Sequence, residues 1–197
     1  MAYHPLEISS TTPKKVQDFI RRHVDMLFED VHCMMRLPIP AQELRASCNF
    51  AAATFLLDLI SGISRSLYSG PGGSGVRFKA VLEKYYPWDM EPAGGFDAKI
   101  GSKVLYDIFR NPLVHALGLS RERMAIGKSG LPEDLLESLE RAVVRPKDGP
   151  AEATICAYPA EKRMDLLVEG LYWGVRHMVY RLTNDLGLMT DVAKTLP

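Results

Sequence analysis

Arg110, Asn111 and His115 are the residues of this chain whose types and spacing best suit a chemical reaction. Histidine titrates near neutral pH, so His115 can take a proton from a ribose 2′-hydroxyl or give one to a leaving oxygen. Arginine can hold two phosphate oxygens at once and stabilise the charge that develops in the transition state. Asparagine can orient either the histidine or the phosphate. Together these side chains suit phosphodiester cleavage without a metal ion.

The spacing of these residues also suits a helix. Asn111 and His115 are four positions apart, which places them on the same face of a continuous helix. Arg110 lies to one side of that face, but its long side chain can swing over. Pro112 disfavours the helical conformation at Asn111 and frees the carbonyl of Ile108. We therefore expect either a kink here or a new helix that begins with Asn111 as its N-cap.

The same residues also have a purely structural interpretation. Asn-Pro is a common helix-capping pair, and His115 could be a half-buried residue with its hydrogen bonds satisfied. Arginines are frequent and the chain has five histidines, so an Arg and a His at this spacing carry little weight by themselves. Cleavage also needs both an acid and a base, and a symmetric dimer would supply two copies of His115 in one cleft.

Other catalytic and metal-binding motifs do not occur in the sequence. Cys33, Cys48 and Cys156 are odd in number and widely spaced, so neither a disulfide framework nor a CxxC metal site is indicated. There is no HExxH, no GxSxG and no GxGxxG after a strand. The glycine-rich stretch 70–75 lacks the Lys-Ser/Thr ending of a P-loop, and we expect a turn there. We expect no metal and no cofactor.

The charge balance argues against general binding of nucleic acid. The chain has 24 Lys and Arg against 24 Asp and Glu, so any RNA contact must come from a local site. A loose set of basic residues is more typical of a solvated surface: Arg121, Arg123, Lys128, Arg141, Arg145 and Lys147. No secretory signal opens the sequence, and its most apolar stretch, 49–64, is too short to span a bilayer. We expect a cytoplasmic protein without a membrane segment.

Apolar periodicity predicts the elements that would position the motif. A long helix begins near Pro13, where Thr11 or Thr12 can cap it, and ends at the proline-rich segment 37–40. A second helix over 41–68 is apolar nearly all round and should be central in a bundle. Further helices are expected over 76–86, over 96–110 and over 160–184. The fourth of these helices carries the motif at its end.

Residues 120–159 break the helical rhythm and are expected to form an insertion. A short helix is predicted over 131–140. The β-favouring runs 142–144 and 153–157 flank an Asp-Gly pair, which indicates a hairpin. The expected fold is therefore mainly all-α: a single domain over 1–197, with four to five long helices in a bundle and a small hairpin-containing insertion around 120–159.

The segment 105–115, LYDIFRNPLVH, resembles the active segment of HEPN (higher eukaryotes and prokaryotes nucleotide-binding) domains. Arg110, Asn111 and His115 match the motif of that family, whereas Pro112 departs from it. Residues 75–87 are similar to an upstream segment of some members. The resemblance implies a HEPN-like bundle, a homodimer and a metal-independent endoribonuclease that cleaves RNA through 2′-hydroxyl attack. It also implies a toxin–antitoxin or phage-defence setting, with an antitoxin or another partner protein.

Two other functions remain open at this point. Some HEPN domains do not cleave RNA, so the chain could be a non-catalytic helical module that binds a partner protein or a nucleotide. The zero net charge favours that alternative. The chain could also be an unrelated helical enzyme or ligand-binding bundle, and phosphate binding by the loop 70–75 would point there.

Overall fold

The computed structural model describes residues 2–36, 48–68, 70–91, 96–116, 141–145 and 153–196, and this part of the chain is mainly helical. The expectation of a mainly all-α protein is confirmed. The predicted helix over 131–140 and most of the loose basic set lie outside the described residues. Within them, no helix is both long and apolar enough to cross a membrane.

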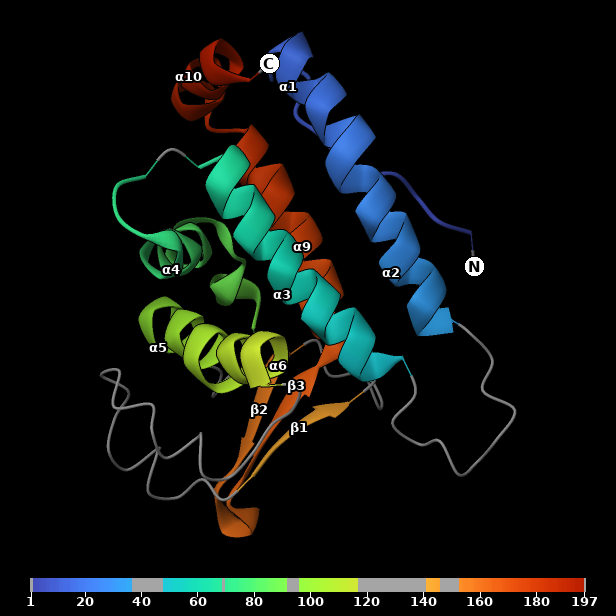
Figure 1. The fold of residues 1–197 in the computed structure, drawn as a ribbon, viewed down its shortest axis with the longest axis vertical. Coiled ribbons are helices and arrows are strands. Elements are labelled where there is room, and N and C mark those ends of the chain that lie inside the picture. The colour runs from blue at the N-terminus through green and yellow to red at the C-terminus, as the bar shows by residue number, and fades with distance from the viewer. Residues whose placement is uncertain are drawn as a thin grey trace.

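Three long helical segments run side by side through the molecule (Figure 1). The first consists of α1 (Lys14–Phe19), a π-helical segment (Ile20–Asp25) and α2 (Met26–Arg36), which follow one another without a break. The second is α3 (Asn49–Ser66) and the third is α9 (Val168–Thr183). Their facing sides bury aliphatic and aromatic residues in one continuous core, with Val16, Phe28, Leu56, Ile60, Val175 and Met178 among them.

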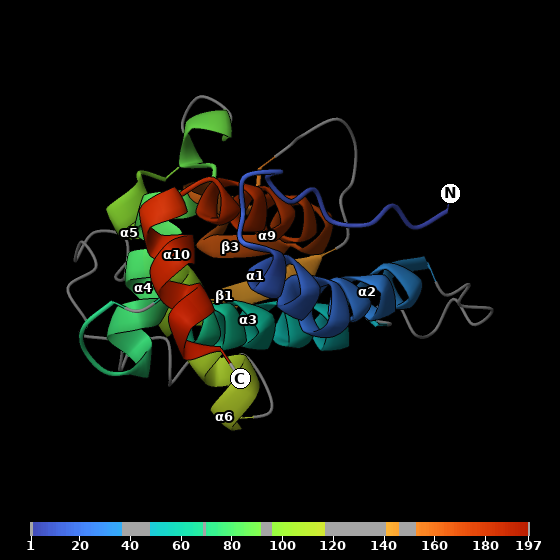
Figure 2. The same ribbon diagram turned by 90° about the horizontal axis from the view of Figure 1, so that it is seen from above.

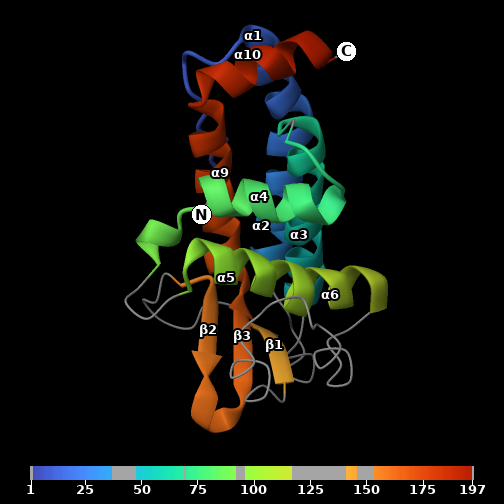
Figure 3. The same cartoon turned by 90° about the vertical axis from the view of Figure 1, so that its left-hand side faces the viewer.

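Shorter helices cross these three. α4 (Ser74–Tyr85) and the run formed by α5 (Ala98–Lys103), a π-helical segment (Val104–Arg110) and α6 (Asn111–Ala116) lie across one side of α3 and α9 (Figure 3). A 3₁₀ turn (Trp88–Met90) precedes α5, and α10 (Leu186–Thr195) lies across the end of the bundle, beside α1 (Figure 2). The helix α4 confirms the predicted helix over 76–86, although it begins two residues earlier.

The helix that carries the motif continues through Pro112. Asn111 has helical backbone angles, φ −63° and ψ −47°, and its N–H bonds to the carbonyl of Tyr106, five residues back. The N-cap alternative is therefore wrong, because Asn111 lies inside the helix. The wider π-helical turn before Pro112 accommodates a residue that cannot donate to the carbonyl four positions back.

A three-stranded sheet lies at the opposite end of the bundle from α10 (Figure 3). Its strands are β1 (Arg141–Arg145), β2 (Ile155–Tyr158) and β3 (Arg163–Leu167), in the spatial order β1-β3-β2. The strand positions of β1 and β2 match the sequence prediction, but the hairpin between them is wrong. Each strand pairs with β3, β1 in parallel and β2 antiparallel.

The predicted last helix, over 160–184, begins too early because its first residues form a strand. Residues 163–167 form the central strand, and the helix begins only at Val168. A 3₁₀ turn and Lys162, whose φ is 47°, reverse the chain between β2 and β3. Inside the strand, Asp165 is buried and its carboxylate lies 2.8 Å from the Nε of Arg163. This ion pair lets an acidic residue occupy the central strand.

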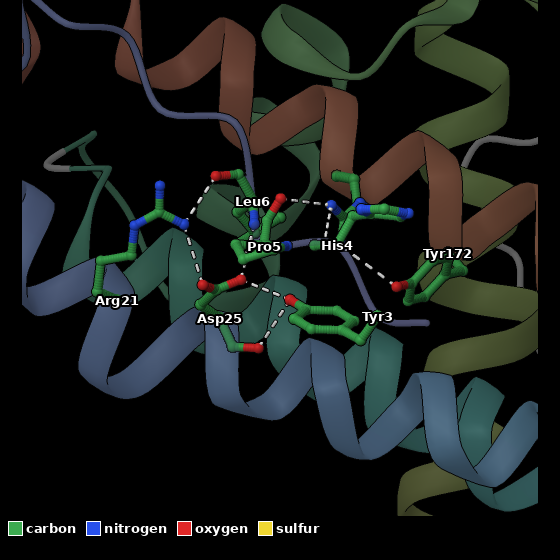
Figure 4. Close-up of polar contacts among 8 residues, drawn as sticks. Tyr3, His4, Pro5, Leu6, Arg21, Asp25 and Tyr172 are labelled. Carbon is green, nitrogen blue, oxygen red and sulfur yellow. Dashed lines mark hydrogen bonds and ion pairs between the residues drawn. The ribbon is translucent and has the colours of Figure 1, made fainter. Parts of the chain in front are cut away.

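The N-terminal segment is bound to the bundle by polar contacts (Figure 4). The Asp25 carboxylate accepts from the Leu6 N–H at 2.8 Å and from the Tyr3 hydroxyl. On α9, one guanidinium nitrogen of Arg176 donates to the carbonyls of His4 and Pro5, at 2.7 and 2.9 Å. The Thr12 hydroxyl donates to the Thr183 carbonyl at 2.9 Å and does not cap α1, so the predicted threonine cap is wrong.

Candidate functional site

A cavity of about 400 Å³ lies where α3, α4 and the π-helical segment meet. Arg65 comes from the end of α3, Arg77 from the first turn of α4 and Arg110 from the end of the π-helical segment. We call it the arginine cavity. The full set of lining residues is Ser61, Gly62, Ser64, Arg65, Ser74, Arg77 and Arg110.

Arg110 is a mostly buried cation that contacts neighbouring side chains of the motif helix. Its side chain is 14% exposed, and its Nη1 donates to the amide oxygen of Asn111 at 3.2 Å. Its guanidinium carbon lies 5.7 Å from the centre of the Tyr106 ring, within the range of a cation–π contact. The amide of Asn111 therefore orients the arginine, whereas the sequence left open whether it orients histidine or phosphate.

Asp58 is an acidic residue that approaches this arginine. One of its carboxylate oxygens lies 3.9 Å from the Nη2 of Arg110, and its side chain is 54% exposed. An ion pair of this length at the surface is weak, because water screens both charges. Asp58 does not line the cavity, and the described lining residues contribute three guanidinium groups and no carboxylate. The arginine cavity is therefore positively charged.

Arg77 adds a buried hydrogen-bond donor to the lining of this cavity. Its Nε is buried, and it has no hydrogen-bond partner among the described residues. A buried donor without a partner costs free energy, which an anion in the cavity would recover. The N-terminus of α4 also lies at this cavity through Ser74, and the partial positive charge of a helix N-terminus favours an anion.

The structure brings together two of the three residues that the sequence singled out. Arg110 and Asn111 are joined by a hydrogen bond, and His115 lies one turn further along α6. The side chain of His115 lies outside the described residues. Sequence reasoning missed Arg65 and Arg77, although Arg77 lies in the segment 75–87 that carries the resemblance.

The chemistry of this lining suits an anion. Guanidinium groups and helix N–H groups are the donors that proteins use for phosphate. Among the described residues, no group of three or more His, Cys, Asp or Glu side chains could hold a metal ion. The arginine cavity can therefore bind a phosphate group and stabilise negative charge on its oxygens.

Comparisons with protein-family models, with curated proteins and with solved structures give no match to this chain.

Proposed function

We propose that this protein is a metal-independent endoribonuclease of the HEPN type and that the arginine cavity holds the phosphate of the bond that is cut. The observation that carries the proposal is the position of Arg110. This arginine belongs to the motif in sequence and shares a cavity wall with Arg65 and Arg77, which come from two other helices.

In the proposed reaction, His115 or its counterpart in a second copy takes the proton of the ribose 2′-hydroxyl. The 2′-oxygen then forms a bond to phosphorus as the bond to the 5′-oxygen breaks. The departing 5′-oxygen receives a proton from the other histidine. The products are a 2′,3′-cyclic phosphate and a 5′-hydroxyl end, and the guanidinium of Arg110 stabilises the charge that builds on the phosphate oxygens.

A homodimer is part of this proposal, because one copy offers one histidine in the motif and the reaction needs an acid and a base. The bundle is proposed to be HEPN-like, which the motif at the end of a late helix supports. We further propose a cytoplasmic setting in toxin–antitoxin or phage defence, with RNA as substrate and an antitoxin as partner. These assignments follow from the resemblance of residues 105–115.

A non-catalytic module that binds a nucleotide is the second candidate. It is favoured by the lining of the arginine cavity, in which the described residues provide phosphate-binding groups but no histidine or carboxylate that could accept a proton. Binding alone would need nothing beyond Arg65, Arg77 and Arg110.

RNA cleavage in the presence of EDTA separates the two candidates. We expect the wild type to cut RNA and leave 2′,3′-cyclic phosphate ends, and His115→Ala to lose activity. His23→Ala, which removes an exposed histidine from the first helix, is the matched control and should cut normally. A folded wild type that binds RNA pools but cuts none of them would reject the nuclease and leave the nucleotide-binding module.

A further inference from the structure

A second cavity of about 320 Å³ lies over α9, and nothing in the proposed reaction uses it. Its walls come from the 3₁₀ turn, from the residues before β2 and from one face of α9. We call it the Glu91 cavity. Its lining residues are Pro87, Met90, Glu91, Thr154, Gly170, Trp173, Gly174 and His177, and none of them lines the arginine cavity.

Glu91 is the acidic side chain among the described residues that line this cavity. Both of its carboxylate oxygens accept from the backbone N–H of Thr154, at 2.9 and 3.1 Å. No cationic side chain among the described residues forms an ion pair with it. Partial burial raises the pKa of Glu91 above its usual value. An ionised carboxylate can accept about four hydrogen bonds, and the described residues use only part of that capacity.

The wall around Glu91 is aromatic and apolar. Trp173 is 46% exposed and Met90 is 50% exposed, although both are large hydrophobic residues. The rings of Trp173 and Tyr172 meet edge to face at 5.3 Å, which fixes the indole on α9. A flat apolar molecule would cover part of this exposed surface. Removal of that apolar surface from water would contribute favourable free energy to binding.

The cavity is held open by contacts beneath and beside it. Asp89 and Arg181 form two parallel hydrogen bonds, at 2.7 and 3.0 Å, which tie the 3₁₀ turn to α9. Gly170 and Gly174 let neighbouring segments approach α9 closely, because a Cβ on either would collide with the Ala153 carbonyl or the Tyr86 hydroxyl. A site that exists before its ligand arrives loses little free energy to reorganisation.

Nearby cations are already engaged. Arg181 is bound to Asp89, and the guanidinium carbon of Arg176 lies 5.4 Å from the Trp173 ring centre. Arg176 donates to the carbonyls of His4 and Pro5 and does not line the cavity. His177 lines the cavity from α9. Among the described lining residues, the carboxylate of Glu91 is therefore the negative charge that a ligand meets.

We propose that the Glu91 cavity binds a small organic cation, with an amidinium or ammonium group on the Glu91 carboxylate and a flat apolar body against Trp173 and Met90. An amidinium presents two parallel N–H groups that match a carboxylate. The volume of the cavity lies at the lower end of the range for small-molecule sites. This inference does not depend on the ribonuclease proposal, because binding is measured without RNA.

Benzamidine is a suitable probe, with isothermal titration calorimetry as the measurement. We expect binding to the full chain with a Kd of roughly 0.1–1 mM, as befits a ligand of this size. Benzamide, which has the same shape without the charge, should bind about tenfold more weakly, and benzoate should not bind. Equal affinity for benzamidine and benzamide would overturn the proposal.

Two variants test whether benzamidine binds in the Glu91 cavity. Glu91→Gln should weaken benzamidine binding about tenfold, whereas Glu83→Gln, which removes a carboxylate from α4 outside the cavity, should not. Trp173→Ala tests the apolar wall independently, because this exposed residue can be replaced without loss of the fold. Unchanged affinity in both Glu91→Gln and Trp173→Ala would overturn the proposal. A blocked arginine amide presents the guanidinium of an arginine in a protein. If it binds more tightly than benzamidine, the cavity is a site for a protein partner, and the proposal is overturned.

Discussion

The Nη2 of Arg110 lies 3.9 Å from a carboxylate oxygen of Asp58, which projects from the neighbouring helix α3. This separation is at the outer limit of an ion pair, and Asp58 is largely in water. A phosphate that enters the arginine cavity would therefore compete with Asp58 for the same guanidinium.

Replacement of Asp58 by Asn should strengthen RNA binding, because it removes a negative charge beside Arg110. We expect the Kd for a short labelled RNA to fall about 1.5- to 5-fold, which corresponds to the usual strength of exposed ion pairs. Fluorescence anisotropy at fixed salt is the measurement. Asp18→Asn removes an exposed carboxylate from α1 and should change the Kd less. Weaker binding by Asp58→Asn would contradict a phosphate site at Arg110.

Arg77→Ala should weaken RNA binding and also reduce its dependence on salt. Each phosphate contact with single-stranded nucleic acid contributes a slope of about −0.7 to log Kobs against log salt. Loss of Arg77 should therefore make the slope about 0.7 less negative. Arg22→Ala removes an exposed arginine outside the cavity and should leave the slope as in the wild type. An identical slope in both variants would exclude contact between Arg77 and phosphate.

Asp185 should make the stability of the protein depend on pH below 4. It accepts from the Tyr85 hydroxyl at 2.6 Å, from the Leu188 N–H at 3.1 Å and from the Lys84 ammonium at 3.0 Å. These bonds, led by the one from Tyr85, lower the pKa of Asp185 from 3.8 to about 2. The carboxylate therefore contributes stability above pH 4 that is lost as the pH falls towards 2.

Urea unfolding of Asp185→Asn at several pH values checks this relationship. The variant should be about 1 kcal/mol less stable than the wild type near pH 7, because it loses charge-assisted bonds at the start of α10. The difference should shrink between pH 4 and pH 2. Asp191→Asn removes an exposed carboxylate from the same helix and controls for the change in net charge. A difference that grows on acidification would show that the assigned direction is wrong.

Two glycine-to-alanine substitutions in helices should have opposite effects. Gly62 has open space around an added Cβ, so Gly62→Ala should stabilise the protein by about 1 kcal/mol through helix propensity. A Cβ on Gly170 would lie 2.2 Å from the Ala153 carbonyl oxygen, so Gly170→Ala should destabilise it by about 1–3 kcal/mol. The midpoints of urea unfolding give both values. A stabilised Gly170→Ala would mean that the segment before β2 packs elsewhere.

Arg176→Lys should loosen the N-terminal segment and leave the bundle intact. Lysine keeps the charge but cannot reproduce the contacts of one guanidinium with His4, Pro5 and the Tyr172 hydroxyl (Figure 4). We expect the amide of Leu6, which donates to Asp25, to exchange about fivefold faster or more. Arg181→Lys on the same helix is the control for exchange at Leu6. Unchanged exchange in Arg176→Lys would show that Asp25 and Arg21 hold Leu6 without a contribution from Arg176.

The helices could be predicted because single residues mark their limits and apolar spacing marks their faces. Pro13 precedes the first helix, Pro87 follows α4, and Val16, Ile20 and Val24 are buried as their spacing predicts. The strand β3 was missed because Met164, Leu167 and Leu171 also fit helical spacing. Over five residues, a strand that is buried on both faces has a pattern of apolar residues similar to that of a helix with one buried face.

The candidate site was predictable only where it is local in sequence. Arg110 and Asn111 are neighbours in the chain, so a resemblance over a short segment could find them. Arg65 and Arg77 reach the same cavity because α3 packs against α4, and no pattern within either helix encodes that contact. The charge of the site thus comes from tertiary packing, which explains why the neutral composition of the chain did not reveal it.

The contacts between the beginning of the chain and α9 have a consequence for synthesis on the ribosome. Thr12 binds the Thr183 carbonyl, and Arg176 binds the carbonyls of His4 and Pro5, across more than 170 residues of sequence. The first helix therefore leaves the ribosome long before its partner helix α9 has been synthesised. Until then the apolar face of α1 and α2 lacks that partner, so chaperones have their longest opportunity to bind the nascent chain there.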